Sequence, residues 1–407
     1  MSMPTETKEI VEQYARRVSE ARVSKLERYG LKIALAERKG AKATDTDGKT
    51  YYDCYCSGGK QVLGHRRPEI VSAMREAIKQ CDLGNFILMS AQKAALAKTL
   101  SNITPGNLKN TVFGVSRGEA NDFAMKLSRG ATGKKEVVCF EGASHGQTAF
   151  ALTATDDPGQ EKLFGPLIPM FKRVPADEAA LEKAVTDKTA AVIIEPIQSD
   201  AGVIFKQASL LKQARAVCDR HGAALIFDEG QTAFGRSGLL FESERSGVAP
   251  DILTVAQGMG GGMYPITATI FTSRLNRFML THPLVHLSTF GGADIGCMVA
   301  MATIELIKKD QLCKNAEERG RQLLEGLNRI VESSSVLKEA RGAGLLIGVE
   351  ADGAARAEKF ISALAASGVI ALPAPANPAV VRFTPPIDIL QNEIDEILDA
   401  TEKAAKQ

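Results

Sequence analysis

Four short segments of the chain carry residue types that could do chemistry, and the first lies where a helix is expected to begin. Residues 116–121 (SRGEAN) follow a strand-like run, 111–115, and precede an amphipathic helical pattern. Ser116 and Glu119 have the spacing of a capping box, and a helix N-terminus that follows a strand is a natural anion site. Gly118 would let an anion approach the backbone closely. A plain helix cap is the alternative interpretation.

The other three segments combine an acidic pair with glycine-dense turns. Residues 226–236 (IFDEGQTAFGR) bring Asp228 to the end of a hydrophobic strand. A carboxylate there lies either in a surface turn or buried opposite a cationic ligand atom, because an isolated buried acid is costly. Residues 256–262 (AQGMGGG) and 288–292 (STFGG) are rich in glycine. Taken singly, such segments are usually turns and identify no function.

The elements that must position these segments alternate along the middle of the chain. Residues 136–140, 191–195, 224–228 and 252–255 are almost continuously apolar, which is typical of buried parallel strands. Between them, apolar residues recur at helical spacing, as in 210–218. Strands separated by helices predict βαβ units and a mostly parallel sheet, whose ligands bind at the carboxyl ends of the strands.

The two ends of the chain differ from its middle. Residues 1–58 and 303–407 are richer in charged residues and in long helical patterns, with a strand expected at 344–349 and a helix at 354–366. We therefore expect one smaller α+β domain made from both ends of the chain, flanking a large domain of residues 59–302 that holds the pocket.

Together and in this order, the segments resemble those of the class III aminotransferases, which have the fold type I architecture for pyridoxal phosphate (PLP). The resemblance covers nearly the whole chain and is carried by the following residues: 52–53, 63–65, Pro68, 140–146 (FEGASHG), 195–198 (EPIQ), 228–231 (DEGQ), 341–344 (RGAG) and 382–383. It implies an α/β fold, in which helices cover a mostly parallel central sheet and both chain ends form a smaller α+β domain.

The resemblance also implies roles for single residues. Asp228 would pair with the protonated pyridine nitrogen of PLP, and Gln231 would contact the phenolic oxygen of the ring. Thr289 would contact the phosphate in the neighbouring subunit's site, which implies a homodimer with its sites at the interface. Glu195 matches the acid of the family's E-P-x-Q turn. Arg382 matches a position that holds a substrate carboxylate in several members, and a bidentate guanidinium suits that task.

The chain departs from the family's pattern around the cofactor. Gln257 stands at the position of the catalytic lysine in A-K-G-x-G-G-G, and an amide forms no Schiff base and is no useful general base. Arg117 and Gly118 stand where the family's S-G-T-E-A-N motif has the glycine and threonine that hold the phosphate. Ser144 replaces an aromatic residue stacked on the pyridine ring, and Gly230 replaces a residue, usually valine, on its other face.

These departures predict a wider pocket in which ordinary lysine-dependent transamination is blocked. Loss of the aromatic stack costs about 0.5–1.5 kcal/mol, and loss of the valine face costs about 1.5 kcal/mol. A cation at Arg117, beside Ser116 and Gly118, contributes about 1.5–3 kcal/mol to anion binding. We therefore expect a strongly cationic end of the pocket, where anion binding survives while ring binding weakens. PLP or pyridoxamine phosphate would then bind without a covalent bond, or not at all.

Two further residues could face a ligand. Lys60, on the substrate side of the family's site, is either a solvated lysine, a contact for a substrate anion or a substitute amine. His145 is either a structural or ring-side residue or a base.

The chain could be an enzyme that acts on an anionic small metabolite by other chemistry. It could instead be a non-catalytic paralogue, or a PLP-dependent transaminase, from amino donor to aldehyde or keto acceptor, with its lysine changed to Gln257.

The composition limits the remaining classes. The chain has 407 residues, 44% hydrophobic and 24% charged, which is typical of a globular protein. Its 50 basic and 48 acidic residues give a net charge of +2, which argues against nucleic acid or a membrane surface as a partner. The charged N-terminal segment and seven scattered cysteines favour a cytoplasmic protein with reduced thiols. The five histidines show no metal-ligand spacing.

Overall fold

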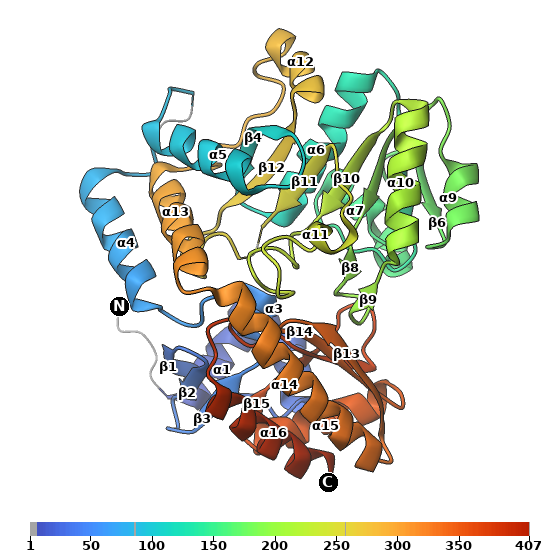
Figure 1. Cartoon of the computed structure of the whole chain (residues 1–407). Helices are drawn as coiled ribbons and strands as arrows, with labels where there is room; N and C mark the ends of the chain where they lie inside the picture. Colours follow the sequence, from blue (N-terminus) through green and yellow to red (C-terminus); the bar gives the residue numbers. More distant parts are fainter. Residues whose placement is uncertain (1–5, 85–86, 257, 407) are drawn as a thin grey trace.

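A seven-stranded sheet forms the centre of the larger part of the molecule (Figure 1). The computed structural model describes residues 6–84, 87–256 and 258–406. In spatial order the strands are β4 (Leu108–Gly114), β12 (Thr267–Thr272), β11 (Ile252–Val255), β10 (Ala224–Asp228), β7 (Thr189–Ile194), β5 (Glu136–Phe140) and β6 (Phe171–Val174). All neighbouring pairs from β11 to β6 are parallel, and β12 alone runs antiparallel to both of its neighbours. The predicted mostly parallel sheet is confirmed.

Both faces of this sheet are covered by helices, because its central strands are apolar on both sides. Every residue of β7 and β10 is buried. Ile193 and Ile226 pack in one hydrophobic cluster with Phe123 of α6 (Arg117–Thr132), whereas Val192 and Leu225 pack in another with α10 (Ala208–His221). Neighbouring residues of a strand point to opposite faces, so the two helices lie on opposite sides of the sheet.

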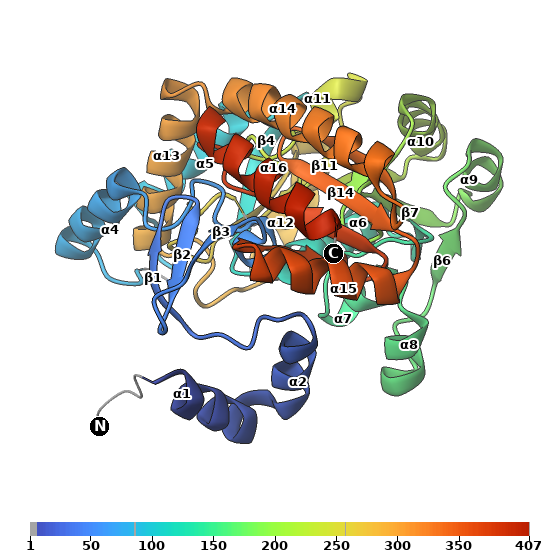
Figure 2. The same ribbon diagram turned by 90° about the horizontal axis from the view of Figure 1, so that it is seen from below.

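The smaller part is built from both ends of the chain. One four-stranded sheet has the order β1 (Leu35–Lys39), β2 (Lys42–Asp45), β3 (Thr50–Asp53) and β15 (Val369–Ile370). The parallel pairing of β3 with β15 joins the two ends. A second sheet has the order β13 (Leu337–Ala343), β14 (Leu346–Ala351), β17 (Val380–Phe383) and β16 (Leu372–Pro373). Figure 2 shows α14 (Leu312–Ser333), α15 (Ala354–Ala366) and α16 (Gln391–Ala405) gathered around these strands.

The remaining elements connect these sheets or cover their edges. A short hairpin is formed by β8 (Ile197–Gln198) and β9 (Ile204–Phe205). The other helices are α1 (Thr7–Tyr14), a π-helical turn (Ala15–Ser19), α2 (Glu20–Arg28), α3 (Cys56–Gly59), α4 (Pro68–Gln80), α5 (Ala91–Ile103), α7 (Ala149–Ala154), α8 (Pro158–Phe164), α9 (Glu178–Ala184), α11 (Ser243–Ser246), α12 (Ser273–Thr281) and α13 (Asp294–Lys309). Of the helices that the structure describes, none is both long and apolar enough to cross a membrane.

The parallel strands end at one edge of the central sheet, and the predicted site residues follow them there. Asp228 is the last residue of β10, and Glu195 comes directly after β7. Ser144 and His145 lie in the loop after β5, and Ser116 lies between β4 and α6. The topology therefore brings together residues that are far apart in the sequence.

Candidate functional site

Helix α6 begins as the sequence predicts. Ser116 is its N-cap, and the Ser116 side-chain oxygen accepts a hydrogen bond from the backbone N–H of Glu119 at 3.2 Å. The Glu119 carboxylate in turn accepts from the backbone N–H of Val115 at 2.7 Å. The helix start is therefore fixed by the side chains of the cap residue Ser116 and of Glu119 in the first turn. The first helical residue is Arg117.

The side chain of Arg117 pairs with two buried acids. Its Nε lies 3.0 Å from each carboxylate oxygen of Asp228, and its Nη2 lies 2.8 Å from Asp228 Oδ2. The same Nη2 lies 2.7 Å from Glu195 Oε1. Only 11% of the Arg117 side chain is exposed. The contact of Arg117 with an anionic ligand stays a prediction, but in the structure its Nε and Nη2 groups bind the protein's own carboxylates.

Asp228 has a full set of hydrogen-bond donors besides Arg117. Its Oδ2 accepts from Asn121 Nδ2 at 2.7 Å and from His145 Nδ1 at 2.8 Å, and its Oδ1 accepts from the backbone N–H of Gly230 at 3.0 Å. Burial opposes ionisation, but Arg117 and His145 outweigh it and hold the pKa of Asp228 well below its usual range. The carboxylate is therefore ionised, and His145 Nδ1 carries the proton of their hydrogen bond.

Glu195 behaves differently from Asp228, although both acids contact Arg117. Glu195 is 2% exposed, and its second oxygen accepts from the backbone N–H of Ser144 at 2.9 Å. Burial raises the pKa of Glu195, and the nearby Arg117 and His145 do not fully offset that rise. Of the two carboxyl groups, Glu195 is thus the one that takes up a proton first when the pH falls.

Arg382 and Asp200 form a second ion pair at the site. The Nη1 of Arg382 lies 2.7 Å from Asp200 Oδ1, 2.8 Å from Ser199 Oγ and 3.1 Å from Gln231 Oε1. The other oxygen of Asp200 accepts from Ser144 Oγ at 2.7 Å. Burial opposes ionisation of Asp200, but Arg382 and Arg117 lower its pKa. The guanidinium of Arg382, which the resemblance assigns to a substrate carboxylate, is thus held by a carboxylate of the protein.

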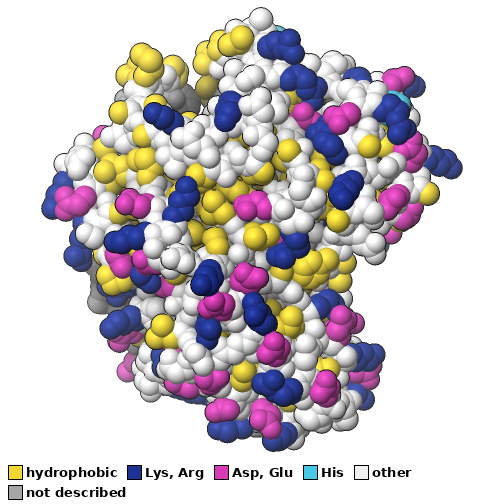
Figure 3. Space-filling model, in the orientation of Figure 1, with side chains coloured by type: hydrophobic (Ala, Val, Ile, Leu, Met, Phe, Trp, Pro, Cys, Tyr) yellow, Lys and Arg dark blue, Asp and Glu magenta, His cyan; other side chains and the backbone are white. Residues whose placement is uncertain are grey.

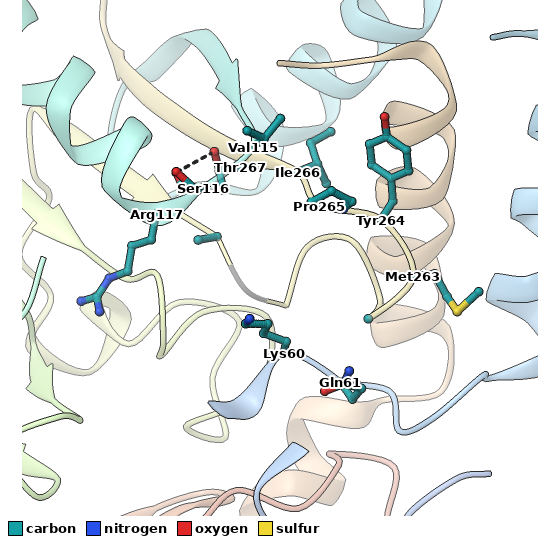
Figure 4. Close-up of a pocket in the computed structure, with 12 residues that line it drawn as sticks. Lys60, Gln61, Val115, Ser116, Arg117, Met263, Tyr264, Pro265, Ile266 and Thr267 are labelled. Atoms are coloured by element: carbon teal, nitrogen blue, oxygen red, sulfur yellow. Dashed lines mark hydrogen bonds between the residues drawn. The ribbon is translucent and has the colours of Figure 1, made fainter. Parts of the chain in front are cut away.

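A cavity of about 390 Å³ opens beside this network (Figure 4). Ser116 and Arg117 line it at the start of α6, and Thr267 lies next to them, its hydroxyl donating to the Ser116 carbonyl at 3.4 Å. Lys60 comes from the segment after α3 and lines the opposite side. A compact ligand in this cavity would meet hydroxyl groups, an ammonium group and the N-terminus of a helix.

One of the predicted residues does not join this arrangement. Thr289 is exposed on the single chain and does not line the cavity. Gln257 lies outside the described residues, although its neighbour Ala256 lines the cavity. Among the residues that the structure describes, no group of three or more His, Cys, Asp and Glu side chains could hold a metal ion.

Three residues of the site were missed by the sequence analysis. Asn121 belongs to the SRGEAN segment, and its place one helical turn after the cap was the available signal. Asp200 follows the EPIQ segment, but a lone acid in a turn is not distinctive. Thr148 lies so close to Gly118 that a Cβ at position 118 would be 2.6 Å from its hydroxyl oxygen. A threonine at position 118, as in the family's motif, would not fit without a shift of Thr148.

Comparison with known proteins links the chain to aminotransferases. The family model described as aminotransferase class-III matches residues 25–405. An uncharacterized aminotransferase of Archaeoglobus fulgidus is 39% identical over 390 residues, which cover 96% of this chain and 92% of the relative. The acetylornithine aminotransferase of Methanothermobacter thermautotrophicus is 37% identical over 368 residues, which cover 90% of this chain and 92% of the relative. The solved ornithine aminotransferase of Toxoplasma gondii superimposes with a TM-score of 0.91 at 25% identity, covering 98% of this chain and 95% of that chain.

The residues present do not fit the PLP ring in the manner that the resemblance implies. Asp228, which would hold the pyridine nitrogen, is already paired with the guanidinium of Arg117. The aliphatic part of Arg117 lies against Gly230, on the side where the family packs valine against the ring. Ser144 offers no aromatic surface, and its hydroxyl donates to Asp200 instead. The charge partner that the resemblance implies for the ring is thus already paired, and Arg117 fills the space beside Gly230.

Proposed function

Because this chain belongs to the class III aminotransferase family, we propose that it is an enzyme that acts on a small anionic metabolite by chemistry other than lysine-dependent transamination. The observation that carries the proposal is the pairing of Arg117 with both Asp228 and Glu195. Gln257 supports it, because an amide forms no Schiff base. The family implies PLP, and we propose that PLP or pyridoxamine phosphate binds here without a covalent bond or is absent.

The lining of the cavity beside α6 favours an anionic ligand. The backbone N–H groups at the start of a helix, together with the helix dipole, favour a negative charge. Lys60 adds a full positive charge across the cavity, and Ser116 and Thr267 add hydroxyl groups. A volume of about 390 Å³ suits a small molecule. A phosphate or carboxylate group near Lys60 is the ligand feature that this lining would recognise.

We predict that Lys60→Gln weakens the binding of an anion by roughly tenfold, because an exposed charge-assisted hydrogen bond is lost. The measurement is calorimetric titration of the purified protein with inorganic pyrophosphate at low ionic strength. Lys314→Gln, which removes another exposed lysine, from α14, is the matched control and should leave the affinity unchanged. Equal affinities for wild type and Lys60→Gln would contradict the assignment of this cavity to an anion.

We predict that PLP forms no covalent adduct in the site of the wild-type protein. The protein is incubated with PLP, reduced with borohydride and digested, and the pyridoxyl-modified peptides are mapped by mass spectrometry. The expected modification is confined to surface lysines and is competed by free lysine. A stoichiometric adduct on Lys60 that resists this competition would contradict the proposal. Lys60 would then be the amine that replaces the family's lysine.

A second candidate function is PLP-dependent transamination by a chain whose lysine has been changed to Gln257. The similarity to an acetylornithine aminotransferase at 37% identity favours it, as does the presence of Asp228, Gln231 and Glu195 at the family's positions. Gln257→Lys decides between the two. Brisk transamination of common amino donors by this variant would support the second candidate. A variant that folds but forms no aldimine absorbance would support the first, because the changed walls of the site would then exclude the cofactor.

We further propose a homodimer whose sites lie at the interface, as is typical of this family. Exposed hydrophobic side chains support a covered surface, among them Leu88 at 72%, Met89 at 99% and Phe290 at 53% exposure. Figure 3 shows hydrophobic side chains gathered at the top of the molecule, over α12 and the connection between α4 and α5. In this dimer Thr289, beside Phe290, would reach the partner's cavity.

The domain division and the localisation are also proposals. We propose that residues 59–302 form the large domain and that residues 1–58 and 303–407 form the small one, which the pairing of β3 with β15 supports. A cytoplasmic location is supported by the seven cysteines, all of which are free thiols.

A further inference from the structure

The backbone conformation at Gly230 does not require a glycine. Gly230 lies in the turn after β10, and its φ is not in the left-handed region that favours glycine. A Cβ built on it would nevertheless lie 2.7 Å from Cδ, 2.8 Å from Nε and 2.9 Å from Cγ of Arg117. Residue 230 must therefore lack a side chain because of Arg117, and not because of the conformation of the turn.

Arg117 cannot easily move away from that position. Its guanidinium is anchored to Asp228 and Glu195, whose side chains are 0% and 2% exposed. Rotating Arg117 toward solvent would leave two buried carboxyl groups without their cation, which is strongly unfavourable. The atoms nearest to Gly230 are the middle of the side chain, so its anchored end cannot flex to accommodate a methyl group.

We propose that Arg117 and Gly230 are a coupled pair that fills the position of the cofactor ring with a cation of the protein itself. A guanidinium is flat, permanently charged and rich in N–H donors. It thus offers Asp228 the same kind of partner as a protonated pyridine nitrogen, and Gly230 leaves room for the side chain that delivers it. The acidic end of the site is then complete without a cofactor. This inference does not depend on which anion the cavity binds, so either proposal can fail alone.

A double-mutant cycle tests the coupling. Gly230→Val in the wild type is expected to lower the melting temperature by about 3–6 °C, because the new side chain overlaps Arg117. In an Arg117→Gly background the same valine is expected to cause no loss, since the space is vacant. Gly159→Val, at an exposed glycine without left-handed φ, is the control and should shift both backgrounds equally. An equal penalty for Gly230→Val in both backgrounds would overturn the proposal.

Ligand binding provides a second readout that does not depend on activity. Pyridoxine 5′-phosphate carries the ring and phosphate of the cofactor but no aldehyde, so it forms no Schiff base. We expect it to raise the melting temperature of Arg117→Gly/Gly230→Val by several degrees and that of the wild type no more than inorganic phosphate does. If Arg117→Gly does not fold, Arg117→Ala and Arg117→Ala/Gly230→Val take its place, because alanine also lacks the Cγ and Cδ atoms that lie nearest to position 230. A ring-dependent rise of equal size in the wild type would show that Arg117 does not occupy the ring position.

Discussion

Replacing Arg117 by methionine is expected to destabilise the folded protein by about 3–5 kcal/mol at pH 8, although the two side chains have similar length. The reason is the pair of carboxyl groups that it leaves behind. Asp228 and Glu195 are buried, and both contact Nη2 of the guanidinium. Methionine replaces the aliphatic part of the side chain but neutralises neither charge. The free energy of unfolding, measured with urea for both proteins, gives the size of the effect.

The penalty should depend on pH, and its direction follows from the pKa values. In the wild type the pKa of Asp228 is held low, so its stabilising contribution is complete above the unfolded value of about 3.9 and is lost only as the pH falls further. In Arg117→Met, Glu195 stays buried without the Arg117 cation, so its pKa, which is already raised in the wild type, rises further. Stability of the variant is then retained at low pH and lost as the pH rises.

The difference between wild type and Arg117→Met should therefore be smallest near pH 5 and increase toward pH 8. Arg356→Met is the matched control, because Arg356 pairs with Asp352 at the surface, where both side chains are more than 40% exposed. Such a pair contributes about 0–1 kcal/mol, so the control should cost little at either pH. A penalty for Arg117→Met that is the same at pH 5 and pH 8 would show that the buried acids are not what makes Arg117 necessary.

The central strands could be predicted from the sequence because burial leaves a strong signal. The predicted strands 136–140, 224–228 and 252–255 coincide with β5, β10 and β11. Parallel strands covered on both faces are continuously apolar, so their limits are visible without knowledge of the fold. The predicted helix 354–366 likewise coincides with α15.

Strands with one exposed face were harder to predict. The sequence of β13, LKEARGA, contains three charged residues, and most of its side chains are at least partly exposed. Nothing in its composition distinguishes it from a loop. Its partner β14 was predicted two residues too early, at 344–349 instead of Leu346–Ala351. In the structure β13 and β14 pair directly in an antiparallel hairpin, which fixes their register through tertiary contacts.

The position of the site could be predicted, but the direction of its side chains could not. Asp228, Glu195 and Ser116 lie at strand ends and a helix start, where the sequence places them. The orientation of Arg117 depends on acids that are 111 and 78 residues away in the chain. Local pattern predicts a cation beside a helix N-terminus, whereas the tertiary structure pairs that cation with two carboxyl groups. Arg382 pairs with Asp200 for the same reason.

Replacing Arg382 by methionine is expected to cost about 3–5 kcal/mol, because it removes the cation that the largely buried Asp200 contacts directly. Asp200 is 15% exposed, and Arg382, together with Arg117, keeps its pKa below the usual range although burial opposes this. Removing both charges in Arg382→Met/Asp200→Asn should cost less than the sum of the single changes. Urea unfolding of all four proteins measures this coupling, and strictly additive losses would contradict a specific pair.

The same variants separate a structural role of Arg382 from the carboxylate-binding role that the resemblance implies. A ligand carboxylate at Nη1 of Arg382 would compete with Asp200, which already binds that atom at 2.7 Å. Asp200→Asn removes that competing charge, so the affinity for a probe such as succinate should rise by roughly tenfold. Because Arg382→Met lacks the guanidinium, it should bind succinate no better than the wild type. If Asp200→Asn leaves succinate affinity unchanged, Arg382 is a structural residue, and the ligand anion is held at the α6 end of the site alone.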